Sequence, residues 1–426
     1  MNRRMHPLEE LHHRGLVQDC TDEQGLYAEL AAGPTSGYVG FDPTVNSLTV
    51  GHLVPLAVLR VFLRAGHFPF VLMGGGTGLI GDPTGKTLER PLLDEEEVEA
   101  NIQGQLGIIR TLFGESSASL EVVDNRDWLG GVGFLEALRG PGRHLSAFGM
   151  FQRDSVQSRR DSGMTYTEFS YQMLQAIDFA HLSQNRGVAV QFGGSDQWGN
   201  MLAGLELIRR SGLKNRAYAL TSPLHLDKDG QKMGKSVLTS VWLSPERTSP
   251  YELYQYFYNL SDDVAEDLWG KIGDEPVEEV QGQIEIWRRV PAQRGPQLAL
   301  ATQVLDSLYG RELRKRCKGA AEAVFSGDLS ALGTAEVDLI VQNLPLTYAP
   351  RSSFLSPGCD SVTLCVIAGV ASGRAEARRL LQSGGVTLNG EVLTEDRVVS
   401  DADLLRGRLL LLRRGNKSWR PLEVRD

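Results

Sequence analysis

Apolar residues in the first half of the chain follow two different spacings. Short runs of consecutive apolar residues, typical of buried strands, alternate with stretches whose apolar residues recur every three or four positions, typical of amphipathic helices. The expected strands are residues 37–41, 66–73, 120–123 and 188–192, and the expected helices are residues 51–62, 95–113, 167–179 and 202–208. This alternation predicts an α/β fold, a Rossmann-like parallel sheet with helices on both faces.

The pattern changes after about residue 246. From residue 249 to about 332 the apolar spacing is helical throughout. Prolines at 345, 350 and 357 then indicate a linker, and the last part begins with a helix and ends in short alternating strands. We therefore expect an α/β domain at 1–246, an α-helical domain at 247–342, a linker at 343–357 and a small α+β domain at 358–426. A length of 426 residues fits two or three domains.

Composition narrows the class of protein. The chain is 41% hydrophobic and 23% charged, which is ordinary for a soluble globular protein. Its longest apolar runs are far shorter than a membrane span, and polar residues stand where a secretory signal would have its apolar segment. We therefore expect no membrane segment and a cytoplasmic location. The four cysteines are scattered, without the spacing of a metal site or a disulfide framework.

Charge is unevenly distributed. The net charge of −9 does not by itself indicate binding of nucleic acid. Basic residues nevertheless gather between positions 374 and 425, and a basic terminal domain on an acidic chain is typical of an enzyme that also holds RNA. Two arginines at the end of the helix near 208 would suit the helix dipole as well. The RNA-binding candidates are Arg209, Arg210, Arg374, Arg378 and Arg379.

Two glycine-rich motifs resemble nucleotide signatures but fit them poorly. Gly76, Gly78 and Gly81 have the spacing of a dinucleotide fingerprint, but Asp82 and Pro83 interrupt where the helix should begin. Residues 81–87 resemble a phosphate-binding P-loop, but the motif is one residue short and its proline removes an N–H group. These departures argue against a dehydrogenase and against a P-loop enzyme.

Other segments carry candidate chemistry. The free N–H groups of a helix opening at Gly51 favour an anion such as a triphosphate, with Thr44 and His52 beside it as neutral donors. Tyr171, Gln175 and Asp178 share one helix face; this polar stripe is either a solvated face or, because apolar residues surround it, the lining of a pocket. Asp196 at the start of a helix fits a helix cap, and this role is compatible with a ligand contact.

Six short motifs in one order resemble bacterial-type tyrosyl-tRNA synthetase, a class I aminoacyl-tRNA synthetase, over nearly the whole chain. They are residues 38–44 (YVGFDPT), 51–53 (GHL), 77–83 (TGLIGDP), 171–178 (YQMLQAID), 193–200 (GGSDQWGN) and 232–236 (KMGKS). The tail resembles an S4 RNA-binding module through residues 372–381 (SGRAEARRLL) and 384–390 (GGVTLNG). The resemblance implies a Rossmann-like nucleotide-binding domain, an α-helical domain and a small S4-like domain.

The resemblance also implies a role for each matching residue. The set that would bind tyrosine is Tyr38, Gly40, Asp82, Tyr171, Gln175, Asp178 and Gln197. Within it Tyr38 and Asp178 would bond the hydroxyl, and Asp82, Tyr171 and Gln175 the α-ammonium. The set that would bind ATP is Asp42, Gly51, His52, Lys86, Arg90, Gly194, Asp196, Lys232 and Lys235. The catalytic set is Thr44, Thr49, His52, Lys232 and Lys235.

The implied reaction joins tyrosine to ATP as tyrosyl-adenylate, with release of pyrophosphate, and then transfers tyrosyl to the 3′ end of tRNA(Tyr). The carboxylate of tyrosine is already an adequate nucleophile, so the enzyme contributes in-line positioning and charge stabilisation. Mg²⁺ would arrive with ATP rather than occupy a dedicated protein site. The family resemblance further implies a homodimer, formed through residues 133–162.

The chain departs from the class signatures at two positions. Thr49 replaces the first histidine of the HIGH-type signature, and its hydroxyl is expected to donate to a phosphate oxygen, with a slower activation step. Gly234 replaces a serine in the second signature and should loosen that loop. The alternatives are a tryptophan-specific synthetase, a paralogue that binds RNA without catalysis, and an adenylate-forming enzyme that does not act on tRNA.

Overall fold

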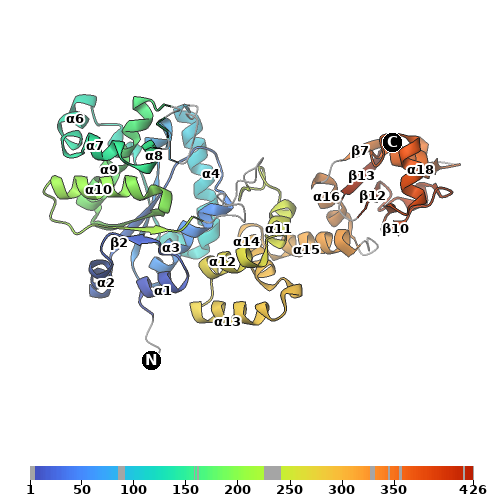
Figure 1. Cartoon of the computed structure of the whole chain (residues 1–426), viewed down its shortest axis with the longest axis horizontal. Helices are drawn as coiled ribbons and strands as arrows, with labels where there is room; N and C mark the ends of the chain where they lie inside the picture. The colour runs from blue at the N-terminus through green and yellow to red at the C-terminus, as the bar shows by residue number, and fades with distance from the viewer. Residues whose placement is uncertain are drawn as a thin grey trace. The chain divides into compact units, whose positions relative to one another are not determined.

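The computed structural model describes residues 5–84, 92–157, 159–160, 163–224, 241–326, 332–343, 346–354, 357–415 and 418–425. Contacts divide the chain into two compact units, and Figure 1 labels their elements. The first unit contains residues 1–248 and 260–308, and the second contains residues 249–259 and 309–426. The helical region after residue 246 is therefore divided between the units. The expected boundaries at 246, 342 and 357 stay a prediction.

The first unit contains a six-stranded sheet. Its strands, in spatial order, are β1 (Asp19–Cys20), β6 (Tyr218–Ser222), β5 (Val188–Gly194), β2 (Ser36–Phe41), β3 (Phe68–Met73) and β4 (Glu121–Asp124). All neighbours are parallel except β1, which pairs antiparallel with β6. From β2 the chain first adds β3 and β4 on one side and later β5 and β6 on the other. The strand order thus reverses beside β2, where α/β folds bind their ligands.

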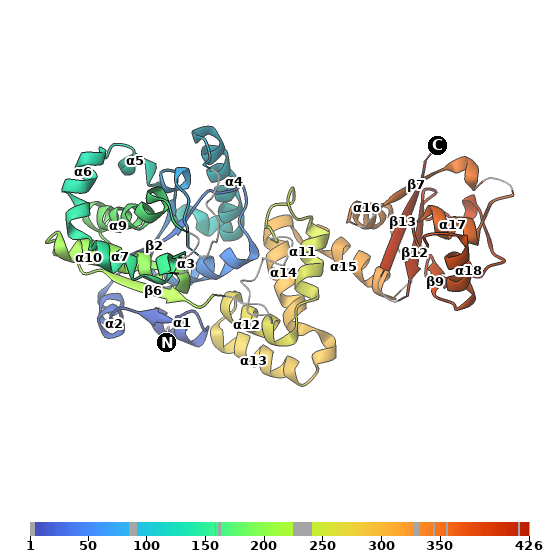
Figure 2. The ribbon, with the colours of Figure 1, turned by 45° about the horizontal axis from the view of Figure 1, so that its top comes forward.

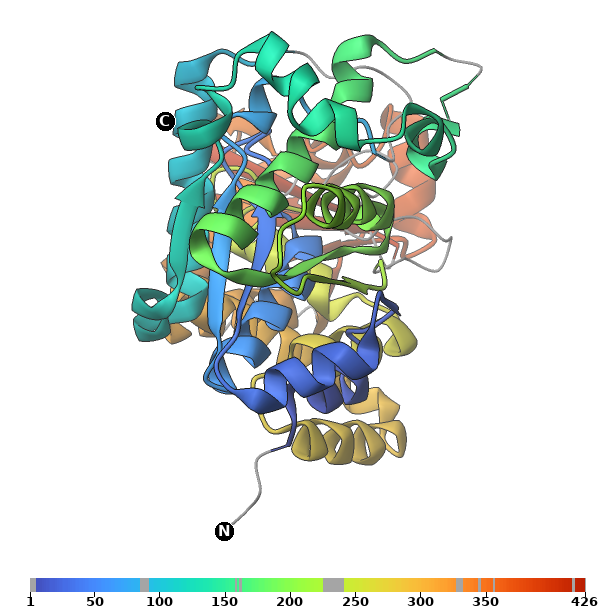
Figure 3. The same cartoon turned by 90° about the vertical axis from the view of Figure 1, so that its left-hand side faces the viewer.

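The first unit also contains helices, and several of them pack on the sheet. The helices are α1 (Pro7–His13), α2 (Glu23–Ala32), α3 (Leu53–Arg64), α4 (Glu95–Phe113), α5 (Arg126–Leu129), α6 (Phe134–Arg139), α7 (Ala147–Phe151), α8 (Asp154–Gln157), α9 (Tyr166–Arg186), α10 (Trp198–Arg210), α12 (Asp262–Ile272), α13 (Val277–Arg288) and α14 (Gly295–Tyr309). Helix α3 packs on β2, β3 and β5, whereas α9 packs on β5 and α10 on β5 and β6. The green helices α9 and α10 lie side by side in Figures 2 and 3.

Alternate residues of the central strands point into two apolar layers. Tyr38 and Phe70 belong to a cluster with Phe179 of α9 and Ile208 of α10. Gly37 precedes Tyr38 on β2 and therefore faces the opposite side of the sheet. A Cβ atom at Gly37 would come within 2.6 Å of the Phe192 ring. Burial on both faces explains why these strands read as continuous apolar runs in the sequence.

Capping residues fix where the long helices begin and end. Asp94 caps α4 by accepting from the Glu97 N–H at 2.8 Å, and Gly114 ends that helix with a φ of +54°. Helix α9 begins with a capping box between Thr165 and Glu168 and ends at Gly187 in the left-handed conformation. The expected helix at residue 51 begins as a 3₁₀ turn (Val50–His52) that continues into α3.

The second unit contains α11 (Pro250–Tyr258), α15 (Arg311–Ser326), α16 (Thr334–Asn343), α17 (Ser361–Ile367) and α18 (Arg374–Gln382). Its strands are β7 (Thr347–Pro350), β8 (Cys359–Asp360), β9 (Val386–Leu388), β10 (Glu391–Val392), β11 (Val398–Val399), β12 (Leu409–Arg414) and β13 (Ser418–Arg425). One sheet has the order β10-β9-β12-β13-β7 and another joins β11 to β8. Strand β7 lies inside the expected linker, and Phe354 just after it is buried in the same core as β12 and β13. Across the described ranges, no helix is both long and apolar enough to cross a bilayer.

Candidate functional site

A cavity of about 430 Å³ opens at the carboxyl ends of β2 and β5, where the strand order reverses. It brings together residues from stretches that lie far apart in the sequence. The expected site residues that line it are Tyr38, Gly40, Asp42, Thr44, Thr49, Gly51, His52, Asp82, Tyr171, Gln175, Asp178, Gly194, Asp196 and Gln197. Four other expected residues, Lys86, Arg90, Lys232 and Lys235, lie outside the described residues.

Asp178 of α9 is a buried carboxyl group in this cavity. Its Oδ2 accepts a hydrogen bond from the Asn125 side-chain amide at 2.9 Å, and its Oδ1 accepts from the Trp128 indole N–H at 2.8 Å. Burial nevertheless raises the pKa of Asp178 to about 7, although both hydrogen bonds favour the charged form. The sequence did not single out Asn125 and Trp128. They follow β4, and their position just beyond a strand end is the signal that could have found them.

Four buried polar atoms of residues that line the cavity have no hydrogen-bond partner among the described residues. They are the hydroxyl oxygen of Tyr38 and the side-chain amide oxygens of Gln105, Gln175 and Gln191. Tyr38 is 1% exposed, and burial raises the pKa of its hydroxyl group well above 10. Buried polar groups are normally hydrogen-bonded, so these atoms make the cavity suitable for a ligand with polar groups of its own. Gln191, which stands opposite Tyr38 on β5, is a further lining residue that the sequence did not reveal.

Carboxylates lie around the phenol of Tyr171. The Tyr171 hydroxyl donates to Oδ2 of Asp42 at 2.7 Å, and the Thr77 hydroxyl donates to Oδ1 of the same residue at 2.8 Å. On the neighbouring loop, Gln197 donates its amide N–H to Oδ2 of Asp82 at 2.8 Å. Burial and these two acids raise the pKa of Tyr171 well above 10. The paired acids make this part of the cavity suitable for a cation such as an ammonium group.

The 3₁₀ turn before α3 places His52 at the cavity wall. Its Nδ1 lies 3.0 Å from the Thr49 backbone nitrogen and 2.8 Å from the Thr49 hydroxyl oxygen. Burial lowers the pKa of His52 to about 4, so its imidazole is neutral at physiological pH. The side chain can therefore act as a neutral hydrogen-bond donor in the cavity. The Val50 and His52 N–H groups of this turn donate to the carbonyls of Val241 and Thr49, so they are not available to an anion as the sequence suggested.

A metal site was expected only through the nucleotide. Among the described residues, no three His, Cys, Asp or Glu side chains gather in a way that could hold a metal ion.

The expected RNA-binding arginines lie on two separate helices, one in each unit. Arg209 and Arg210 end α10, where Arg210 pairs with Glu206 at 2.8 Å. On α18, Arg374 pairs with Asp360 at 3.6 Å and Arg378 with Glu395 at 3.3 Å. Arg379 makes no ion pair with any described residue. These surface pairs are weak and easily exchanged for phosphate contacts.

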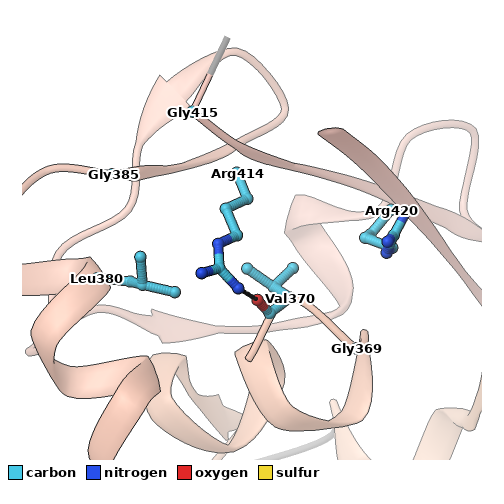
Figure 4. A pocket seen from close by; sticks show the side chains of 7 residues that line it. All are labelled: Gly369, Val370, Leu380, Gly385, Arg414, Gly415 and Arg420. Atoms are coloured by element: carbon cyan, nitrogen blue, oxygen red, sulfur yellow. Dashed lines mark hydrogen bonds between the residues drawn. The ribbon is translucent and has the colours of Figure 1, made fainter. Parts of the chain in front are cut away.

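A second cavity, of about 520 Å³, lies beside α18 in the second unit (Figure 4). It is lined by Gly369, Val370, Leu380, Gly385, Arg414, Gly415 and Arg420. Arg414 donates to the Val370 carbonyl at 3.1 Å and pairs with Glu376 at 3.0 Å. The charge of Arg414 is thus already compensated within the protein.

Comparisons with known proteins agree with this geometry. A family model described as tRNA synthetases class I (W and Y) matches residues 31–326, and a model of the tyrosine–tRNA ligase SYY-like C-terminal domain matches residues 349–421. The fold, the cavity and these matches together make the chain a class I tRNA synthetase. Tyrosine–tRNA ligase from Staphylococcus carnosus is 41% identical over 419 residues, which are 97% of each chain. Within the class, the chain belongs to the tyrosine–tRNA ligase family.

Other relatives and solved structures are similar as well. Tyrosine–tRNA ligase from Roseiflexus castenholzii is 40% identical over 426 residues, covering 97% of this chain and 98% of that protein. A C-terminally truncated mitochondrial tyrosyl-tRNA synthetase from Aspergillus nidulans superposes with a TM-score of 0.66 at 28% identity, covering 76% of this chain and 95% of the other. An Archaeoglobus fulgidus tyrosyl-tRNA synthetase complexed with L-tyrosine has a TM-score of 0.56 at 20% identity, covers 73% and 99%, and shares the fold.

Proposed function

We propose that the cavity activates L-tyrosine with ATP and that the enzyme then transfers the tyrosyl group to tRNA(Tyr). The observation that carries the proposal is the pair Tyr38 and Asp178, because both line the cavity and the Tyr38 hydroxyl has no protein partner among the described residues. A tyrosine hydroxyl would satisfy both groups. Phenylalanine would leave them unpaired, a discrimination already known for tyrosine-specific synthetases as a class.

We propose the remaining roles from the resemblance to the tyrosine–tRNA ligase family, and most of these residues line the cavity. Asp82, Tyr171 and Gln175 would bind the α-ammonium, and Gln197 would lie near the reacting carboxylate. Gly194 and Asp196 would bind the ribose, and Gly40, Asp42 and Gly51 would complete the binding surface. Thr44 and His52 would bond the phosphates, and Lys232 and Lys235 would receive the leaving pyrophosphate.

The chemistry needs no general base. The tyrosine carboxylate attacks the α-phosphorus, the bond to the β-phosphate oxygen breaks, and pyrophosphate leaves with the electron pair. The protein contributes alignment and hydrogen-bond donors around the charged phosphorus. Mg²⁺ bound to ATP would neutralise phosphate charge.

The partners of the reaction suggest further properties. Arg374, Arg378 and Arg379 of α18, with Arg209 and Arg210 of α10, are proposed contacts to tRNA. A homodimer through residues 133–162 is supported by large apolar side chains there, since Phe134, Leu135, Phe148 and Phe151 are 64%, 72%, 72% and 54% exposed. The substrates, ATP and tRNA, fit a cytoplasmic location.

Exchange of labelled pyrophosphate into ATP, measured with tyrosine, phenylalanine and tryptophan in turn, tests the proposal. We expect exchange with tyrosine alone. Tyr38→Phe should lower the preference for tyrosine over phenylalanine about tenfold, because it removes one hydroxyl contact. Tyr27→Phe is the matched control, since its hydroxyl bonds Glu9 on the surface and lies outside the cavity. The proposal would be overturned if tryptophan supported exchange. It would also be overturned if none of the three amino acids supported exchange.

A further inference from the structure

Thr49 stands where class I signatures have their first histidine, and its side chain is engaged within the protein. Its hydroxyl oxygen lies 2.8 Å from Nδ1 of His52, and its backbone nitrogen lies 3.0 Å from the same atom. The hydroxyl that the sequence directs to a phosphate oxygen thus faces the second signature histidine instead.

The backbone N–H decides where the imidazole carries its hydrogen. A backbone N–H can only donate, so Nδ1 of His52 must be the unprotonated acceptor. The Thr49 hydroxyl can then donate to the same lone pair. A neutral imidazole has one ring hydrogen, which therefore lies on Nε2. Within the described residues, Nε2 makes no hydrogen bond, and the ring lines the cavity beside Thr44 and Gly51.

Thr49 is itself held by a distant segment of the chain. Val50 donates its N–H to the Val241 carbonyl at 3.1 Å, and Leu243 donates its N–H to the Leu48 carbonyl at 2.8 Å. Thr49 and Trp242 form the antiparallel bridge between these two bonds. The position of Thr49, and through it that of the His52 ring, is therefore fixed from outside the 3₁₀ turn.

We propose that Thr49 is a positioning residue: it holds the His52 ring with the Nε2 hydrogen directed at an oxygen of the bound nucleotide, and it makes no phosphate contact of its own. The inference rests on the proposed function, because it assigns Thr49 a part in adenylate formation. It also accounts for how the signature works with threonine at this position. The shorter side chain contributes by orienting the histidine that remains.

A double-mutant cycle on tyrosine-dependent pyrophosphate exchange separates this role from direct phosphate contact. Thr49→Val removes the hydroxyl and keeps the shape and the backbone N–H. We expect it to lower kcat about fivefold in the wild-type background and less than about twofold in a His52→Ala background. Equal losses in both backgrounds would mean that Thr49 acts on the nucleotide directly and would overturn the proposal.

The pH dependence of kcat separates this role of Thr49 from a purely structural role, which would leave the pH profile unchanged. The Thr49 hydroxyl favours the neutral form of His52, so Thr49→Val should shift the acid limb of kcat to higher pH. Thr49→Ser keeps a hydroxyl group, so it should have the wild-type kcat and the wild-type position of the acid limb. Thr111→Val is the matched control, because its hydroxyl bonds Gly107 on the exposed face of α4. An unmoved acid limb would also count against the proposal. A wild-type enzyme without exchange would refute the proposed function itself, which is a distinguishable failure.

Discussion

At the scale of single residues, Asp178 combines two properties that usually exclude each other. It is 2% exposed, so burial penalises its charge, yet two donors, Asn125 and Trp128, address its oxygens. The outcome is a carboxyl group whose pKa is raised from 3.8 to about 7. Burial of such a group costs free energy of folding, and a pKa perturbed in this way is typical of functional sites.

Asp178→Asn is expected to lose specificity and gain stability. The folded protein holds a proton on Asp178 between pH 4 and 7 that the unfolded chain has released, so this group makes the fold less stable as pH rises through that window. Asparagine removes this penalty, so the free energy of unfolding at pH 8 should rise by up to about 4 kcal/mol, less the cost of turning the asparagine amide group toward one of the two donors. Urea unfolding at pH 8 and pH 4 measures the difference, which should be small at pH 4. Pyrophosphate exchange should show the tyrosine preference over phenylalanine reduced about tenfold or more. Equal stability changes at the two pH values would contradict this account.

The sequence could reveal only part of this site. Helical spacing placed Tyr171, Gln175 and Asp178 on one face, because the period of a helix is regular enough to be read from the chain. Asn125, Trp128 and Gln191 escaped because their roles depend on which strand lies next to which. That information is created by the fold, and the position of Asn125 and Trp128 just beyond a strand end is the one local signal for them.

At the scale of elements, the start of α9 depends on a buried ion pair. The Glu168 carboxylate accepts from both terminal nitrogens of Arg159, at 2.9 and 3.2 Å, and from the Thr165 backbone N–H at 3.1 Å. The side chains of Arg159 and Glu168 are 5% and 4% exposed. This one carboxylate therefore neutralises a buried cation and caps the helix that presents Asp178 to the cavity.

Glu168→Ala should be strongly destabilising. It leaves the Arg159 charge buried without its carboxylate partner and removes half of the capping box, so the free energy of unfolding should fall by about 3–5 kcal/mol. Glu121→Ala is the control, because its pair with Arg186 is half exposed on both sides and should be worth less than about 1 kcal/mol. Urea denaturation of the two variants makes the comparison. Similar losses in both would show that burial of the Arg159 pair is not what stabilises α9.

At the scale of the whole molecule, part of the expected linker is paired with the last strand of the chain. Strand β7 pairs with β13 along four residues, from Thr347 with Leu422 to Pro350 with Arg425. Ala349 and Phe354 belong to the same buried core as Leu412 and Leu422. A chain cut within the proline-containing segment would therefore leave apolar side chains without their partners.

Two truncations test this boundary. A chain ending at residue 343 should keep tyrosine-dependent pyrophosphate exchange and lose most charging of tRNA, because the basic α18 is removed. A chain ending at residue 357 should behave alike in catalysis, but it retains Ala349 and Phe354 without their core and should be the less soluble of the two. Thermal denaturation and light scattering compare the products. Loss of exchange in the shorter chain would mean that activation needs the C-terminal module.

The order of strands and helices was easier to predict from the sequence than the short backbone pairings that connect distant segments. The alternation of short apolar runs with helical spacing led directly to a parallel sheet. The two-residue strand β1 and the bridge between Thr49 and Trp242 gave no signal. Such short pairings are made by backbone groups, which every residue possesses, so composition does not mark them.

The elevated pKa of Asp178 also has a calorimetric consequence. At pH 7 about half of the unliganded molecules carry the proton. If the bound hydroxyl donates to the ionised carboxylate, binding of tyrosine releases about half a proton to the buffer at that pH. The apparent heat of binding should therefore differ between phosphate and Tris, whose ionisation enthalpies differ widely, and tyrosine affinity should weaken as pH falls below 7. Calorimetric titration with tyrosine in the two buffers would measure the number of protons released on binding. Asp178→Asn should abolish the difference in heat between the buffers.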